Sequence, residues 1–330
     1  MGKRTICFKN KPRISGTFTV AGPKEGSGDL GKYFDRVIFD DKFGENTFEK
    51  AERKMLSSAV TGAINAAKLT VCDVDAFISG DLLNQIISSS FVAREFDFPF
   101  IGVYNACSTL TEAFSLAATL TDGGYMRNVV VGTVSHFSTA ERQYRYPLEL
   151  GSTRPPQSQW TVTGSGAAVV TNEGDGPKIV AATFGKVVDF GVIDANNMGA
   201  AMAPAAADTL NRLFHETATS PDDYDLILTG DLGALGSRLL KKLSFDNGYD
   251  LSKNHSDCGE MIFNIDEEDY QGGSGAGCSA IVFNSYIYEK LRKKQINRMI
   301  LLATGALLST VSSQQGESIP CIAHAVVLES

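Results

Sequence analysis

Two short strings placed 150 residues apart indicate that one structural unit occurs twice in this chain. Asp75-Ala-Phe-Ile-Ser-Gly-Asp-Leu82 matches Asp225-Leu-Ile-Leu-Thr-Gly-Asp-Leu232 in residue type and spacing. A repeat of about half the chain is far longer than the unit of a solenoid. The strings therefore predict two related halves, residues 1–172 and 173–330.

A second set of matches supports the repeat. Its members are separated pairs that share one offset of 171 residues: Cys107-Ser108 with Cys278-Ser279, and Arg127 with Arg298. Each half also closes with an apolar segment, at 166–170 and 324–327. Chance rarely keeps separated matches in register, so we interpret the halves as duplicates.

Composition limits the class of protein. With 330 residues, 43% hydrophobic and 21% charged, the chain can bury a large core. It has no apolar run long enough to span a membrane, and residues 1–9 lack the apolar core of a signal peptide, so we expect a soluble, cytoplasmic-type protein. A net charge of -8 argues against a nucleic-acid partner. Six cysteines without CxxC spacing are typical of reduced thiols.

Hydrophobic periodicity predicts alternating helices and strands. Helices are expected at 46–67, 108–120, 201–216 and 279–294, and strands at 76–79, 100–104, 128–133, 226–229 and 298–304. The strands are short, continuous apolar runs, as in a sheet that is covered on both faces. This alternation indicates a layered α/β fold.

Two related α/β halves, the first with a cysteine at a strand-to-helix turn in Asn105-Ala-Cys-Ser-Thr109, resemble the thiolase superfamily, which includes the beta-ketoacyl synthases. Within that superfamily the chain is similar to the stage V sporulation protein AD family of spore-forming bacteria. The strings that carry this similarity are Ala21-Gly-Pro-Lys-Glu25, Ser79-Gly-Asp-Leu-Leu-Asn84, Ala140-Glu-Arg-Gln143, Arg145-Tyr-Pro147, Ala201-Met-Ala-Pro-Ala-Ala-Ala-Asp208 and Glu317-Ser-Ile-Pro-Cys-Ile-Ala-His324.

The resemblance implies a five-layered αβαβα fold built from the two halves. It also implies that the chain binds dipicolinic acid, which is pyridine-2,6-dicarboxylate, during its uptake into the developing spore. The implied partners are membrane proteins of the same sporulation transport system, through which the chain would associate with the membrane. No cofactor is implied.

Cys107 is the central candidate of the site. A cysteine at the start of a helix faces unpaired backbone N–H groups and the positive end of the helix dipole, which predicts a lowered thiol pKa. In the condensing enzymes of the superfamily, such a thiolate attacks an acyl thioester. Alternatively, Cys107 is a small buried core residue that only packs and takes no part in chemistry.

The acid–base partners of a condensing enzyme are missing where the superfamily commonly holds them. The loop 230–236 contains neither His nor Asn, and the segment 272–278 lacks the Gly-His-Pro and Gly-Asn strings. Cys321 resembles the second cysteine of thiolases, and His324 lies close to it in sequence. If Cys107 is catalytic, His324 or His255 is the expected partner; otherwise we expect no catalysis.

The same architecture suits a small dianion. Backbone N–H groups at the Cys107 helix start and in the glycine-rich turn around Gly273 can receive carboxylates. The loop after the strand at 128–133 supplies His136, Arg142 and Arg145 as candidate ligand-binding residues, although charged loops often face only solvent.

Further candidates for the ligand site are weaker. Asn84 follows a strand and is either a hydrogen-bond donor or a turn former. Ser165 is expected in the pocket wall or in close backbone packing, and His324 is a further candidate. Residue types that can bind a metal occur together at His255, Asp257 and Cys258, but no second cluster completes a set of ligands, so no bound metal is expected. Dipicolinic acid can still arrive as its calcium chelate.

Three functions remain open from the sequence: dipicolinic acid binding without catalysis, an acyl-thioester condensing enzyme with Cys107 as nucleophile, and a scaffold that binds no ligand. The resemblance also implies a homodimer, formed through the strand at 100–104 that precedes Cys107.

Overall fold

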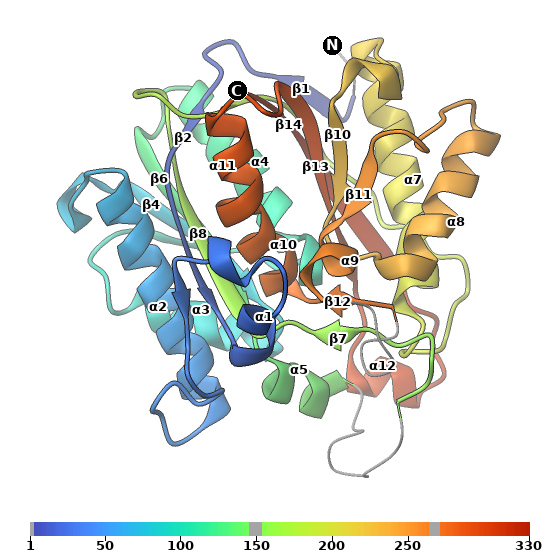
Figure 1. The fold of residues 1–330 in the computed structure, drawn as a ribbon, viewed down its shortest axis with the longest axis horizontal. Coiled ribbons are helices and arrows are strands. Elements are labelled where there is room, and N and C mark those ends of the chain that lie inside the picture. Colours follow the sequence, from blue (N-terminus) through green and yellow to red (C-terminus); the bar gives the residue numbers. More distant parts are fainter. Residues whose placement is uncertain (1–2, 145–153, 264–270) are drawn as a thin grey trace.

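Apolar strands form the centre of the molecule, which the computed structural model describes for residues 3–144, 154–263 and 271–330. Twelve strands join in one mixed sheet, in which ten follow the order β11-β10-β13-β14-β9-β2-β8-β6-β4-β5 (Figure 1). These ten strands are β2 (Arg13–Ala21), β4 (Ala76–Asp81), β5 (Phe100–Gly102), β6 (Asn128–Ser135), β8 (Gly164–Thr171), β9 (Lys178–Thr183), β10 (Leu226–Thr229), β11 (His255–Asp257), β13 (Arg298–Ala306) and β14 (Cys321–Glu329).

Four short strands complete the description. Two lie at the margins of the main sheet, where β1 (Thr5–Cys7) pairs with β9 and β3 (Arg36–Val37) pairs with β2. The other two, β7 (Trp160–Thr161) and β12 (Gly273–Ser274), form a separate parallel pair. This small pair joins a segment of the first half to a segment of the second.

The strand order is the same in the two halves. In the first half, β4 runs parallel to β5 and β6, and β8 runs antiparallel to β6 and β2. In the second half, β10 runs parallel to β11 and β13, and β14 runs antiparallel to β13 and β9. The two sets of five strands meet where Arg13 of β2 pairs with Lys178 of β9.

Helices complete the five predicted layers. The helices of eight or more residues are α2 (Phe48–Ala66), α4 (Thr109–Asp122), α5 (Phe137–Tyr144), α7 (Met198–Thr217) and α8 (Gly233–Asp246). The shorter helices are α1 (Pro23–Ser27), α3 (Ile87–Ala93), α9 (Cys258–Ile262), α10 (Ala276–Val282), α11 (Tyr288–Arg292) and α12 (Thr310–Gln314). In Figure 1, α2 and α3 cover one outer face, α7 and α8 cover the other, and α4 and α10 lie between the two sets of strands.

The core explains why the strands read as continuous apolar runs. In β13, Met299 and Leu301 pack in the central layer with α4 and α10, whereas Ile300 and Leu302 pack in the outer layer with α7. Because successive side chains of a strand point to opposite faces, a strand between two helical layers needs an apolar residue at every position. The predicted strands are confirmed for this reason.

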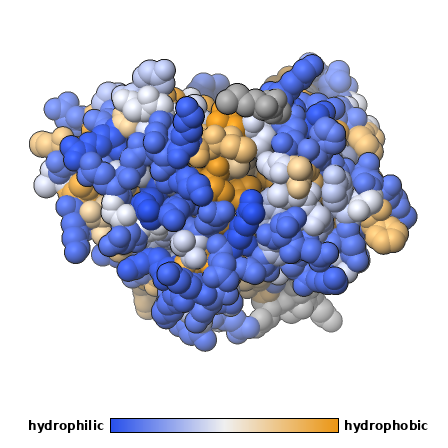
Figure 2. Space-filling view, turned by 90° about the horizontal axis from the view of Figure 1, so that it is seen from above, coloured by the Kyte–Doolittle hydropathy of each residue, from blue (hydrophilic) through white to orange (hydrophobic). Residues whose placement is uncertain are grey.

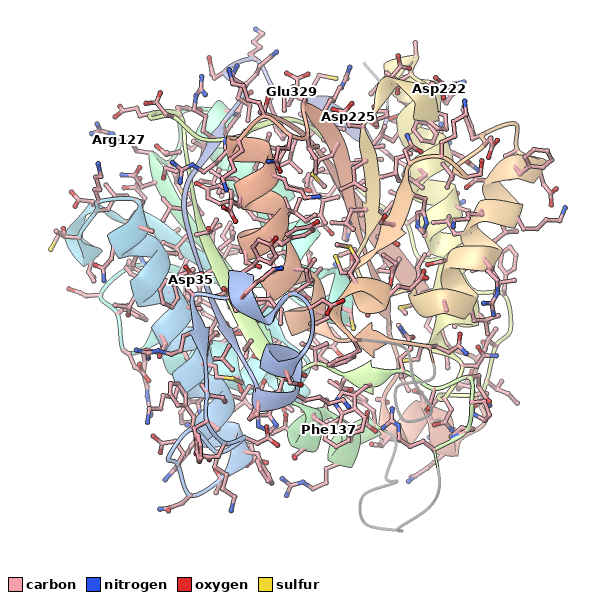
Figure 3. All side chains as sticks on the ribbon, in the orientation of Figure 1. Asp35, Arg127, Phe137, Asp222, Asp225 and Glu329 are labelled. Carbon is pink, nitrogen blue, oxygen red and sulfur yellow. The ribbon has the colours of Figure 1, made fainter. Side chains whose placement is uncertain are left out.

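The duplicated aspartates have the same structural role in both halves. Asp75 accepts hydrogen bonds from the backbone N–H groups of Arg127 and Asn128, at 2.6 and 2.9 Å. Asp225 accepts the equivalent bonds from Asn297 and Arg298, at 2.7 and 3.1 Å. Each carboxylate thus ties the start of one strand to the start of its neighbour, and Figure 3 places Arg127 and Asp225 at the same end of the molecule.

The helix predicted over residues 279–294 is interrupted in the structure. The segment expected to be a single helix over 279–294 consists of α10, a π-helical turn (Phe283–Ile287) and α11. A Cβ atom at Gly166 of β8 would lie 2.4 Å from the carbonyl oxygen of Ala280, so this glycine lets α10 lie directly on the strand. Gly166 therefore serves close backbone packing, which is one of the two roles expected for its neighbour Ser165.

The two ends of the molecule are formed by different elements. The end shown in Figure 2 is mostly hydrophilic, with a smaller hydrophobic area near its middle. At the opposite end, α5, β7, β12 and α12 gather around the segment that leads into α4, and Figure 3 labels Phe137 there. The candidate site lies at this second end.

Candidate functional site

Cys107 lies between strand β5 and helix α4, as predicted. It occupies the middle of a single 3₁₀ turn (Ala106–Ser108), and α4 begins at Thr109. Ala106 has a φ of +49°, a left-handed backbone conformation that is uncommon for a residue other than glycine. Such a conformation persists only where the surroundings enforce it, and it is frequent at functional sites.

A pocket opens above Cys107. Its cavity volume is about 30 Å³, and the total rises to about 410 Å³ only when all the space between its walls that opens to solvent is included. Apolar side chains form most of the wall, among them Leu82, Met198 and Leu308. Its polar side chains come from both halves: Cys107, Tyr104, Tyr144, Thr161 and Ser274.

Two tyrosines close the outer side of this pocket. The hydroxyl groups of Tyr104 and Tyr144 lie 3.3 Å apart, and the hydroxyl of Tyr144 donates to the backbone carbonyl of Leu82. Tyr104 also lines a wider groove outside the pocket, together with Asn84 and Ser309. Tyr104 therefore separates the inner pocket from the groove.

Asp231 supplies a carboxyl group behind the pocket. It follows β10, belongs to the duplicated string and is 1% exposed. Its Oδ1 accepts a hydrogen bond from the hydroxyl of Thr304 at 2.8 Å, and its Oδ2 accepts one from the hydroxyl of Ser274 at 3.0 Å. Burial raises the pKa of Asp231 above its usual value, and the thiol of Cys107 is close enough for the two groups to affect each other's pKa.

The predicted lowering of the Cys107 pKa is wrong. Burial of the thiol, followed by the charge of Asp231 and its hydrogen bond, raises the pKa of Cys107 well above its usual value. The backbone N–H of Gly275 acts in the opposite direction and does not offset these effects. Cys107 is therefore a protonated thiol at neutral pH.

The candidate acid–base partner His324 has structural contacts instead. The backbone N–H of Gly185 donates to its Nδ1 at 3.1 Å, and its Nε2 lies 3.2 Å from the side-chain amide nitrogen of Asn105. Burial lowers the pKa of His324 to about 4, so its ring is neutral at pH 7. His324 does not line the Cys107 pocket.

The other residues named for catalysis also lie outside the pocket. His255 is on β11 at one edge of the sheet, where its Nε2 is 3.0 Å from the hydroxyl of Thr229. Burial lowers the pKa of His255 to about 3. Cys321 begins β14, and burial raises the pKa of its thiol to about 12. Neither residue lines the pocket.

His136 and Arg142 do not converge on Cys107. The Nε2 of His136 donates to the backbone carbonyl of Asp41 at 2.7 Å, and its Nδ1 accepts from the N–H of Ser138. Arg142 forms an ion pair with Glu49 at 3.2 Å on the surface. His136 points inward, as expected, but its contacts hold α5 to a neighbouring loop. Arg145 lies outside the described residues.

The three remaining candidates take different positions. Asn84 accepts a hydrogen bond from Gln143 at 2.7 Å and lines the outer groove. Ser165 donates to the carbonyl of Thr133 at 3.0 Å within the sheet. Gly273 precedes Ser274 in β12, and its carbonyl accepts from the side chain of Gln159 at 3.0 Å. Of these residues, Gly273 lies nearest to the pocket wall.

Sequence reasoning missed three residues of the site: Asp231, Tyr104 and Tyr144. For Asp231 a signal existed, because it is the second-last residue of the duplicated string and follows the core strand β10. For the tyrosines no comparable signal existed, because their hydroxyl groups meet only where the end of α5 contacts the segments that follow β4 and β5.

Comparison with known proteins decides the family. The family model described as stage V sporulation protein AD matches residues 2–329. The chain belongs to the stage V sporulation protein AD family. Stage V sporulation protein AD of Bacillus subtilis (strain 168) is 44% identical over 328 residues, which cover 99% of this chain and 97% of that protein. Membership in this family of sporulation proteins gives the chain a role in sporulation.

Solved structures show that the stage V sporulation protein AD fold seen here is the thiolase-like fold of condensing enzymes. The 3-oxoacyl-[acyl-carrier-protein] synthase III of Aquifex aeolicus VF5 is 15% identical, with a TM-score of 0.59, and the match covers 97% of this chain and 100% of that chain. OleA of Xanthomonas campestris is 13% identical, with a TM-score of 0.64, and covers 98% of this chain and 100% of that chain. The predicted fold class is confirmed.

Two properties of the described residues bear on partners. Across the three described ranges, no helix combines the length and apolar character needed to cross a membrane. Within the same ranges, the structure does not bring together three or more His, Cys, Asp or Glu side chains in a way that would hold a metal ion.

Proposed function

We propose that this chain binds dipicolinic acid without catalysis and thereby supports uptake of the acid into the developing spore. The observation that carries the proposal is the Cys107 pocket itself. It keeps the nucleophile position of a condensing-enzyme fold, but its thiol is protonated and neither His324 nor His255 lines it. Because the cavity measures about 30 Å³, the proposal requires its wall to move outward when the ligand enters.

The pocket wall supports a planar aromatic acid as the ligand. Leu82, Met198 and Leu308 offer apolar contact to a pyridine ring. The side chain of Tyr104 is partly exposed at the mouth. Its hydroxyl donates to that of Tyr144, which itself donates to Leu82, and it can donate to a ligand carboxylate instead by leaving this contact. Apolar walls with few polar groups are the usual composition of a small-molecule site.

The charge of the ligand is the second point of the proposal. Free dipicolinic acid is a dianion at neutral pH, whereas the side chains that line the pocket include no Lys or Arg among the described residues. Asp231 behind the pocket adds a carboxyl group, and the chain carries a net charge of -8. Calcium chelation cancels the ligand charge, so the free acid and its calcium chelate are both candidate forms.

Transport is proposed to depend on partners. The structure offers no membrane-crossing helix within the described residues, so contact with the membrane is assigned to membrane proteins of the same sporulation system. In this arrangement the chain captures the ligand, and its partners move the ligand across the membrane.

Titration calorimetry tests the binding step. We expect saturable binding of dipicolinic acid or its calcium chelate to the wild type and to Cys107→Ala, and loss of binding in Cys107→Trp, whose side chain fills the pocket. Tyr125→Trp, at an 81% exposed position, is the matched control and should bind normally. Absence of binding of either form to folded wild type would overturn the proposal.

A second function is favoured by one observation. The left-handed Ala106 holds Cys107 at the start of α4 in the fold of condensing enzymes, which favours an acyl-thioester enzyme with Cys107 as nucleophile. Incubation with acetyl coenzyme A, followed by peptide mass spectrometry, tests this function. Acetylated Cys107 would support it, whereas unmodified Cys107 after prolonged incubation would leave ligand binding as the better account.

A further inference from the structure

We infer that the last turn of α5, residues 142–144, is a gate over the Cys107 pocket and that the hydroxyl of Tyr144 is the latch that holds this gate closed. The inference rests on the proposed function, because it names the part of the pocket wall that moves when the ligand enters. It assigns the opening of the pocket to one turn of one short helix.

The closed pocket is too small for the proposed ligand. Its cavity volume of about 30 Å³ is enough for about two water molecules, whereas small-molecule sites measure about 300–1,000 Å³. Dipicolinic acid is an aromatic ring that carries two carboxyl groups, so it needs several times this space. The groove outside Tyr104 has a cavity volume of about 620 Å³. Since Tyr104 lines both spaces, a wall that moves beside Tyr104 joins the pocket to the groove.

Much of the pocket wall is fixed in the core. The start of α4 is tied to β13 and β14 through the buried hydroxyl of Ser108. Ser274 is bonded to the buried carboxyl group of Asp231 at 3.0 Å. Met198 and Leu308 belong to the large apolar cluster around α7. Outward movement of these walls would disrupt the sheet or the core.

The first part of α5 is also anchored in the interior. The hydroxyl of Thr139 donates to the buried carboxyl group of Glu52 at 2.6 Å. The carboxyl group of Glu141, which is also buried, accepts from the hydroxyl of Thr161 at 3.1 Å. Between them, Ala140 is buried in the pocket wall. These contacts hold the first part of the helix in place.

The last turn of α5 is held by contacts at the surface, at the outer margin of the molecule (Figure 1). The ion pair of Arg142 with Glu49 joins side chains that are 43% and 40% exposed. The side-chain amide of Gln143 donates to that of Asn84 at 2.7 Å, also at an exposed position. Exposed pairs of this kind compete with water and stabilise little, and segments held in this way open most readily.

Tyr144 makes the contact of this turn that closes the pocket. Its hydroxyl donates to the backbone carbonyl of Leu82 and lies 3.3 Å from the hydroxyl of Tyr104. Its ring lines the pocket and packs against the small apolar cluster that contains Cys107. A ligand carboxylate that accepts from Tyr104 takes this hydroxyl away from Tyr144. Ligand entry and release of the latch are therefore coupled.

Cys107 reports the opening without any ligand. Its side chain is 7% exposed in the closed pocket, so a bulky reagent reaches the sulfur only when the wall opens. The test compares iodoacetamide, from which the thiolate displaces iodide, with the bulkier N-phenylmaleimide, to whose double bond the thiolate adds. Peptide mass spectrometry follows each cysteine from about pH 7 to 10, with the exposed Cys7 and Cys72 as internal references.

The variant is Tyr144→Phe, which keeps the ring and removes the hydrogen bond of the latch. Tyr288→Phe is the matched control, because the hydroxyl of Tyr288 also donates to a backbone carbonyl, that of Ile14 at 3.2 Å, and Tyr288 does not line the pocket. Loss of one hydrogen bond changes an opening equilibrium about fivefold. We therefore expect Tyr144→Phe to raise the Cys107 rate with N-phenylmaleimide about fivefold at every pH, and Tyr288→Phe to match the wild type.

The pH profile separates opening from thiol acidity. A gate changes the height of the Cys107 profile and leaves its midpoint in place. A shifted midpoint that accounts for the whole change in rate would overturn the inference, and so would equal Cys107 rates in the wild type and in Tyr144→Phe that circular dichroism shows to be folded.

The wild-type arm remains decisive if the variant does not fold. Relative to Cys72, Cys107 should lose about tenfold in rate when N-phenylmaleimide replaces iodoacetamide, because the larger reagent needs the wider opening. An equal ratio for the two reagents would overturn the gate. The readout needs no dipicolinic acid: if the acid fails to bind but Tyr144→Phe still exposes Cys107, the proposed function fails and the inference stands.

Discussion

The hydroxyl of Ser108 donates a hydrogen bond to the backbone carbonyl of Ala303 at 2.7 Å, which ties the residue after Cys107 to the β13 strand of the other half. The same oxygen accepts a hydrogen bond from the backbone N–H of His324 at 3.1 Å. One fully buried side chain therefore joins the start of α4 to two strands of the second half.

Replacing Ser108 with alanine tests the strength of this junction. The change leaves a buried carbonyl and a buried N–H without their partner, which costs about 1–3 kcal/mol of the free energy of unfolding. Urea denaturation at pH 7 measures the loss. Ser27→Ala, at an exposed position where the hydroxyl bonds only its own helix, is the control and should change the free energy of unfolding by less than about 0.5 kcal/mol.

The sequence predicted the fold well because its helices and strands are indicated by patterns within consecutive residues. The strand at 226–229 has the predicted bounds in β10, and the predicted 128–133 forms most of β6. Strands between helical layers are apolar at every position, and helices carry a period near 3.6. These signals are contained in consecutive residues, so they could be identified without the structure.

The candidate site was predicted less well because its chemistry depends on distant contacts. The helix-start argument for Cys107 is local, whereas the opposing carboxylate of Asp231 comes from the other half of the chain. His136 was correctly expected to point inward, but its partner is the carbonyl of Asp41, which no sequence period indicates. Periodicity identifies which residues are buried and does not identify which polar groups meet.

A buried carboxyl group predicts a pH dependence of stability. Glu25 of α1 is 1% exposed and accepts a hydrogen bond from the N–H of Thr163 at 2.9 Å; burial raises its pKa to about 8. Between about pH 4.5 and 8 the folded state therefore keeps a proton that the unfolded state releases. Rising pH thus favours unfolding through this group.

Glu25→Gln should remove this dependence. A difference of one pKa unit corresponds to about 1.4 kcal/mol, so we expect the variant to exceed the wild type in free energy of unfolding by about 2–4 kcal/mol at about pH 9, and by little near pH 4.5. Urea denaturation across this range measures the difference. Glu95→Gln, on the surface, should follow the wild-type curve, and a Glu25→Gln curve parallel to that of the wild type would contradict the prediction.

Tyr104 should contribute to ligand affinity through its hydroxyl. A hydrogen bond to a charged group contributes about 1.5–3 kcal/mol, so Tyr104→Phe should weaken binding of dipicolinic acid about tenfold or more while leaving the fold intact. Calorimetry measures the change, and Tyr125→Phe is the matched control at the exposed site. Equal affinities for wild type and Tyr104→Phe would show that the ligand does not use this hydroxyl.

The last prediction concerns assembly. Strand β5 ends the sheet order and pairs only with β4 among the described strands, so its outer edge is open to a second copy of the chain. We propose a homodimer through β5 and expect light scattering at micromolar concentration to give twice the chain mass of 35.4 kDa. A lysine at an edge position opposes strand pairing, so Ile101→Lys should give the single-chain mass. Ser256→Lys, on the β11 strand at the other end of the sheet, should remain dimeric. A wild-type protein with the mass of one chain would exclude the dimer at that concentration.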